Sequence, residues 1–112
     1  MKKDPKIFLK HIQESIEKTE KHIKGMSEDK FEDDIKTQDA VIRRIEIIGE
    51  AVKNLPLEFK KKHSEIEWRE IAGMRDKLIH EYFGINLNMV WEVIRKDIPK
   101  LKRQISELLE KF

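Results

Sequence analysis

The sequence contains no cysteine, and only three prolines and four glycines interrupt its 112 residues. The absence of cysteine excludes disulfide bonds and thiolate metal sites. No apolar run approaches the roughly 20 residues that a membrane-spanning helix needs, and the charged N-terminal segment MKKDPKIFLKHIQ lacks the apolar stretch of a signal peptide. These absences predict a soluble, cytoplasmic protein that does not associate with a membrane.

Positive and negative charges are nearly balanced along the chain. Charged residues make up 41% of the chain, yet the net charge is only +2. Charges that alternate in sign are typical of solvated helix faces, and they exclude a protein that binds nucleic acid through bulk positive charge. Any site for a polyanion must therefore be local. The length predicts a single domain over residues 1–112.

Apolar residues recur at helical spacing through nearly the whole sequence, and no run alternates as a strand would. We expect a short helical turn capped by Ser27, a third main helix capped by Ser64, and a kink or two nearly collinear helices around Pro99. The four main helices are expected over residues 5–24, 37–55, 65–79 and from 86–88 to the C-terminus. The predicted fold class is all-α, an antiparallel bundle of four main helices with a short turn helix.

Gly49 lies close to the core face of the predicted second helix. A glycine in the middle of a helix costs about 1 kcal/mol relative to alanine. The residue therefore predicts that another helix approaches closely at this point.

Arg75 interrupts the apolar stripe of the predicted third helix. On a helical wheel at about 100° per residue it falls within the arc of Ile71, Met74 and Leu78. A buried guanidinium without a partner is costly, because it stays charged throughout the physiological pH range. Arg75 must therefore reach a carboxylate, a helix terminus, a water-filled cleft or an anionic ligand.

One edge of the predicted second helix offers partners for Arg75. It carries four charged residues at spacings of three and four: Asp39, Arg43, Glu46 and Glu50. One interpretation is structural, with a salt bridge from Arg75 to one of these carboxylates and an ion-pair ladder in which Arg43 pairs with its acidic neighbours. The other is that these four residues orient Arg75 or His80 within a functional site.

His80 adds a group that can carry protons near neutral pH. Together with a guanidinium that holds phosphate oxygens, an imidazole can serve phosphodiester chemistry. On one straight helix, however, His80 points about 140° away from Arg75, whereas Tyr82 returns to nearly the direction of Arg75. The pair converges only if the helix breaks near residues 79–81, helped by Gly84, or if two copies of the chain form the site as a homodimer.

The segment RDKLIHEY, from Arg75 to Tyr82, has the order arginine, four residues, histidine, any residue, tyrosine. In this it resembles the HEPN superfamily and, more closely, the HepT-like ribonuclease toxins. The flanking segments RRIEIIGEAVKNLP and VWEVIRKDIPKLKRQI resemble them too, so the likeness extends over about residues 35–105. It implies a compact HEPN-like helical bundle that dimerises and cuts RNA without a metal ion or another cofactor.

The resemblance also implies roles for three residues. Arg75 and His80 would be the catalytic pair: His80 would take or deliver the proton when the ribose 2′-hydroxyl attacks the adjacent phosphate, and Arg75 would bind that phosphate. Tyr82 would receive AMP from an MntA-type nucleotidyltransferase antitoxin, and the added anionic groups would repel RNA. The implied partners are RNA, a second copy of the chain and the antitoxin.

Two other interpretations are compatible with the same residues. In the first, the chain is a non-catalytic helical module that binds a nucleotide or docks a nucleotidyltransferase, and Arg75 only holds a phosphate. In the second, it is a structural interaction protein with Arg75 locked in an internal salt bridge. No group of carboxylates and histidines has metal-ligand spacing, so no metal site is predicted.

Overall fold

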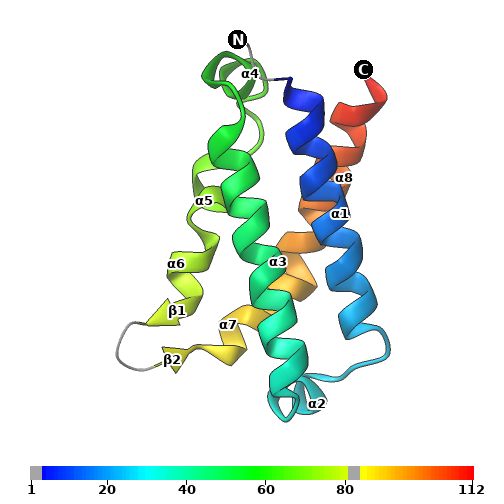
Figure 1. Cartoon of the computed structure of the whole chain (residues 1–112), viewed down its shortest axis with the longest axis vertical. Coiled ribbons are helices and arrows are strands. Elements are labelled where there is room, and N and C mark those ends of the chain that lie inside the picture. The colour runs from blue at the N-terminus through cyan, green and yellow to red at the C-terminus, as the bar shows by residue number, and fades with distance from the viewer. Residues whose placement is uncertain (1–3, 81–83) are drawn as a thin grey trace.

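Long helical segments form the body of the molecule in the computed structural model, which describes residues 4–80 and 84–112 (Figure 1). The first two segments are α1 (Pro5–Ile23) and α3 (Ile35–Asn54), which pack against each other along their length. The third is a continuous run of α7 (Leu87–Glu92), the π-helical turn η1 (Val93–Asp97) and α8 (Ile98–Glu110). The predicted all-α class is confirmed.

The helix starts follow the capping residues in the sequence. The Asp4 carboxylate accepts a hydrogen bond at the start of α1, and Ser27 caps the short helix α2 (Glu28–Glu32) as predicted. Asp34 caps α3 by accepting from the backbone N–H of Thr37 at 3.0 Å, so α3 begins two residues before the predicted start at Thr37. That hydrogen bond lowers the pKa of the Asp34 carboxyl from its usual 3.8.

One apolar core joins the long helices. Each contributes a stripe at helical spacing, as predicted from the sequence. The buried residues of these stripes include Leu9, Ile12 and Ile16 of α1, Val41, Ile45, Ile48 and Val52 of α3, and Ile98, Leu101, Ile105 and Leu108 of α8. Within the described ranges, no helix combines the length and the apolarity that crossing a membrane requires.

The predicted third helix is replaced by shorter elements, so the prediction of one continuous helix is wrong. After α4 (Leu57–Lys62) the chain forms α5 (Trp68–Ala72) and α6 (Met74–Leu78), each of five residues and separated by Gly73. Ser64 does not cap α5, whose N-cap position is taken by Glu67 without a side-chain hydrogen bond. Glycine is a weak helix former, and the break at Gly73 accords with that weakness.

A short pair of strands follows α6, contrary to the expectation of no strands. The strands β1 (Ile79–His80) and β2 (Gly84–Ile85) are antiparallel, with Ile79 opposite Ile85 and His80 opposite Gly84. Two residues are too few to produce a recognisable alternation in the sequence. Gly84 has a φ of +79°, a left-handed conformation that glycine adopts without steric cost.

The helix around Pro99 is continuous, and its irregularity lies before the proline. The backbone N–H of Ile98 donates to the carbonyl of Val93, five residues earlier, which makes η1 wider than an α-helical turn. Proline lacks an N–H, and its ring would crowd the carbonyl of Arg95 in a regular α-helix. The wide turn is therefore placed where the α-helical pattern is weakest.

The close approach predicted at Gly49 is confirmed. A Cβ atom built on Gly49 would lie 3.1 Å from the backbone carbonyl oxygen of Ala72, at the end of α5. Figure 1 shows α5 and α6 running beside α3 toward the β1–β2 pair. Gly49 thus sets how close the segment that carries Arg75 can lie to α3.

We predict that Gly49→Val lowers the free energy of unfolding by about 1–3 kcal/mol, since the new side chain meets a backbone atom that cannot rotate away. Urea denaturation measures the loss. The control is Lys53→Val, one turn further along α3 at a side chain that is 57% exposed. It introduces the same β-branched residue into the helix without the clash, so an equal loss in both variants would contradict the prediction.

Candidate functional site

Arg75 lies at the edge of the core and not within it. Met74 and Leu78, on the same short helix α6, are buried, and they turn Arg75 toward α3 with its side chain 48% exposed. The expectation that Arg75 interrupts a buried stripe is therefore wrong. Arg75 is exposed because the helix breaks at Gly73, so that only two residues of the short helix α6, Met74 and Leu78, face the core.

A salt bridge fixes the Arg75 guanidinium on α3, as the structural interpretation of the sequence predicts. Nε of Arg75 donates to Oε2 of Glu46 at 2.8 Å, and Nη1 lies 3.7 Å from Oδ1 of Asp76. Pairs as exposed as this one contribute about 0.2–1 kcal/mol to stability, so the contact matters more for position than for energy. Within the described part of the chain, neither Nη atom donates a hydrogen bond, which leaves that end of the fork accessible to a ligand.

Arg75 lines a surface hollow of about 320 Å³ between α3 and the α5–α6 segment, here called the α3–α6 hollow. Its floor includes the close contact between Gly49 and Ala72. The other lining residues are charged, with three of each sign: Arg43, Lys53 and Arg75, and Glu46, Glu50 and Asp76.

The four residues of α3 that were predicted to support the site differ in whether they line the hollow and in whether they contact Arg75. Arg43, Glu46 and Glu50 line the α3–α6 hollow, whereas Asp39 does not. Only Glu46 of the four forms a salt bridge with Arg75 in the described ranges. The predicted ladder around Arg43 is wrong, because no carboxylate of the described residues lies within 4 Å of its guanidinium.

The backbone near His80 follows the predicted break. The helix ends at Leu78, whose carbonyl accepts from the N–H of Asn86 at 2.9 Å and so closes the base of the β1–β2 pair. The helical-wheel direction expected for His80 therefore does not apply, because His80 lies in β1 and not in a helix. The side chain of His80 and the whole of Tyr82 lie outside the described part of the chain, so their roles stay predictions.

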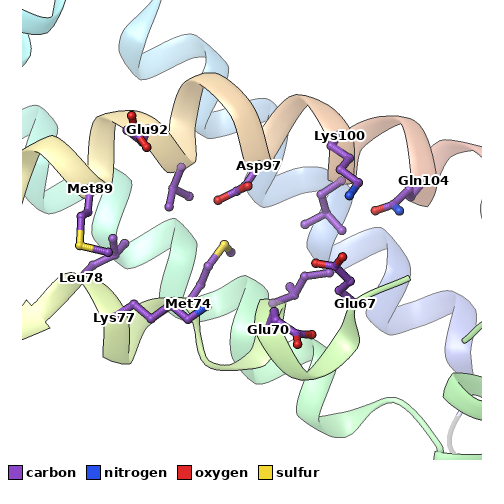
Figure 2. Close-up of a pocket in the computed structure, with 13 residues that line it drawn as sticks. Glu67, Glu70, Met74, Lys77, Leu78, Met89, Glu92, Asp97, Lys100 and Gln104 are labelled. Atoms are coloured by element: carbon purple, nitrogen blue, oxygen red, sulfur yellow. The ribbon is translucent and has the colours of Figure 1, made fainter. Parts of the chain in front are cut away.

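A second cavity lies on the other side of α6. This groove has a volume of about 300 Å³, and its lining residues lie between α5–α6 and the α7–η1–α8 run (Figure 2). Met74 and Leu78 contribute to its apolar wall, and Glu67, Glu70, Glu92 and Asp97 are among its charged lining residues. Its lining contains no arginine or histidine among the described residues, so it does not match the predicted chemistry.

The described part of the chain contains no group of three or more histidines and carboxylates arranged to hold a metal ion. What the α3–α6 hollow offers instead is a fixed guanidinium that remains half exposed. Such a group can bind a phosphate through its free edge and balance negative charge that develops there.

Comparison with known proteins shows a family match over most of the chain. The family described as ribonuclease HepT-like matches residues 12–108. A Methanocaldococcus jannaschii protein named "Gamma-glutamylcyclotransferase and putative RNase" is 57% identical over 112 residues, which are 100% of this chain and 50% of that protein. The chain thus spans about half the length of that relative.

Two further relatives have nearly the same length as this chain. A protein of Caldanaerobacter subterraneus subsp. tengcongensis named "Putative RNase" is 52% identical over 109 residues, covering 97% of each chain. A Thermococcus cleftensis protein named "Probable ribonuclease HepT" is 49% identical over 108 residues, covering 96% of this chain and 98% of the relative. No solved structure gives a significant match.

We predict that the Nε–H proton of Arg75 exchanges slowly with water, because Glu46 accepts its hydrogen bond. Nitrogen-15 NMR of the arginine side chains measures this exchange. Glu46→Ala should make the exchange fast, and Asp76→Ala should leave it slow, since Asp76 lies near Nη1 and not near Nε. Equal exchange rates in wild type and Glu46→Ala would contradict the contact.

Proposed function

The chain belongs to the HepT-like ribonuclease family, and from this premise we propose that it is a metal-independent endoribonuclease and the cytoplasmic toxin of a HepT/MntA-type toxin–antitoxin pair. The observation that supports this most directly is the state of Arg75. Its guanidinium is held by Glu46 at 2.8 Å while its side chain stays 48% exposed. The edge of the guanidinium that faces away from Glu46 donates no hydrogen bond within the described residues, so a phosphate can reach it.

In the proposed reaction, the 2′-hydroxyl oxygen of a ribose attacks the adjacent phosphorus atom. A new P–O bond forms, the bond to the 5′-oxygen of the next nucleotide breaks, and the products carry a 2′,3′-cyclic phosphate and a 5′-hydroxyl. Arg75 binds the non-bridging phosphate oxygens and stabilises the charge that develops on them. His80 takes the proton of the 2′-hydroxyl or delivers one to the leaving oxygen.

The need for two proton transfers favours a homodimer. Attack and departure require a base and an acid, and the motif of one chain contains a single histidine. Two copies related by a two-fold axis would bring a second His80 and a second Arg75 to a shared cleft. The position of His80 in a strand pair that follows α6, and not in a long rigid helix, is compatible with such an arrangement.

Regulation would act on Tyr82, two residues after His80. A nucleotidyltransferase antitoxin would transfer AMP from ATP to the tyrosine oxygen, with release of pyrophosphate. Each AMP adds a phosphodiester charge and a bulky nucleoside near the catalytic pair. RNA would then be excluded by repulsion and by volume.

We predict that Arg75→Ala lowers kcat for RNA cleavage by about 10²–10³-fold, the loss typical of removing a group that stabilises an anionic transition state. Cleavage of a labelled RNA by protein purified without the antitoxin measures it, with EDTA present to test metal independence. His80→Ala should be similarly impaired. Arg103→Ala is the matched control, since Arg103 is an exposed arginine on α8 that lines neither the α3–α6 hollow nor the groove of Figure 2.

The proposal fails if unmodified wild-type protein leaves RNA as intact as the Arg75→Ala/His80→Ala double variant does. Calorimetry with mononucleotides then tests the alternative of a non-catalytic nucleotide-binding or nucleotidyltransferase-docking module. Tight, Arg75-dependent binding without turnover would favour that alternative.

We expect intact-mass spectrometry to show AMP increments on the chain after co-expression with its nucleotidyltransferase and ATP. The increments should be absent from Tyr82→Phe, which retains the ring and removes the acceptor oxygen. Modified wild type should have lost RNA cleavage, whereas Tyr82→Phe should keep it in the presence of the antitoxin. Increments that persist in Tyr82→Phe would place the modification elsewhere.

A further inference from the structure

We propose that Arg43 binds the RNA phosphate next to the one that is cleaved, so that the α3–α6 hollow holds two consecutive phosphates of the strand. The inference rests on the proposed ribonuclease function and assigns Arg43 a direct contact with substrate. This differs from the orienting role expected from the sequence, since within the described residues no hydrogen bond or salt bridge joins Arg43 to the carboxylates of Glu46 and Asp76 that contact Arg75.

Arg43 differs from the other two cations of the hollow. Nζ of Lys53 lies 3.6 Å from Oε1 of Glu50, and Arg75 is paired with Glu46. The exposed side chain of Arg43 has no carboxylate within 4 Å and donates no hydrogen bond within the described residues. A ligand can therefore engage the whole guanidinium of Arg43 without displacing a protein carboxylate, whereas on Arg75 only the edge away from Glu46 is open.

The lack of a partner is not explained by a lack of candidates. Asp39 and Glu46 lie four residues before and three residues after Arg43 on α3, spacings at which side chains on a helix meet. Glu46 instead accepts from Arg75 across the hollow. The salt bridge that fixes one guanidinium thus leaves the other available on the same surface.

The chemistry of the hollow favours a phosphodiester strand as the ligand. A guanidinium presents planar pairs of donors that match phosphate oxygens. Because the hollow is lined by three cations and three carboxylates, an anion would be held there by individual contacts and not by a general positive field. A strand with one negative charge per nucleotide can place one phosphate at Arg75 and the next at Arg43.

The contact should affect binding and not chemistry. The phosphate at Arg43 keeps the same charge when its neighbour reacts, so Arg43 would hold the ground state and the transition state equally. Removing such an interaction raises KM and leaves kcat unchanged. Arg75→Ala, by contrast, should lower kcat.

The test compares Arg43→Ala, Arg43→Lys and the control Arg103→Ala. In steady-state RNA cleavage, Arg43→Ala should raise KM on the order of tenfold with kcat unchanged. Binding of a single-stranded 2′-O-methyl RNA, which cannot be cut through its 2′-oxygen, is measured between low and moderate salt. The slope of log K against log salt should decrease in magnitude by about 0.7 in Arg43→Ala and stay unchanged in Arg43→Lys and Arg103→Ala.

Three results would overturn the inference. Arg43→Ala could keep the KM and the salt dependence of binding of the wild type, or it could lower kcat with KM unchanged. The control Arg103→Ala could also lose as much salt dependence of binding as Arg43→Ala does. Any of these leaves the ribonuclease proposal standing if wild type cuts RNA and Arg75→Ala does not. If wild type cuts no RNA, the ribonuclease proposal fails. The binding slopes then still decide whether Arg43 contacts a phosphate.

Discussion

The close contact between Gly49 of α3 and the backbone of Ala72 is the constraint on which the candidate site depends. The Cβ atom of any side chain at position 49 would lie 3.1 Å from the backbone carbonyl oxygen of Ala72. With glycine there, the segment that carries Arg75 can lie against α3, within reach of Glu46. Gly49 therefore lowers the helix propensity of α3 locally, and it allows the segment that carries the Arg75 guanidinium to lie close to α3.

The helix that bears Arg75 has little stability of its own. It is five residues long, well below the length at which an isolated helix persists in water. Burial of Met74 and Leu78 anchors it to the core, and the pair with Glu46 fixes the guanidinium on the outside. The groove of Figure 2 lies behind the same two apolar side chains, so the placement of Arg75 depends on packing on both sides of α6.

Much of the fold could be predicted from the sequence because long apolar periodicities and end caps act locally. Such patterns predicted α1 to within one residue, the Ser27 cap and the close approach at Gly49. They also predicted that helical structure continues on both sides of Pro99. The third helix was mispredicted because Gly73 and a two-residue strand pair give almost no periodic signal. Spacing could name Glu46 as one of several partners for Arg75, but the choice among them depends on how α6 is placed on α3.

The π-helical turn η1 affects where in the last helical run a residue could be deleted without disturbing the core. A turn of this kind holds one residue more than an α-helical turn, and it lies between two segments whose buried faces are already fixed by Val90 on one side and Leu101 on the other. Loss of a single residue here would return the turn to α-helical spacing and keep both buried faces toward the core, although the Pro99 ring would then crowd the carbonyl four residues before it. Elsewhere in the same helix a deletion would turn apolar residues toward water. Of the positions in this helix, η1 is thus the one where the loss of one residue would least disturb the buried faces on either side.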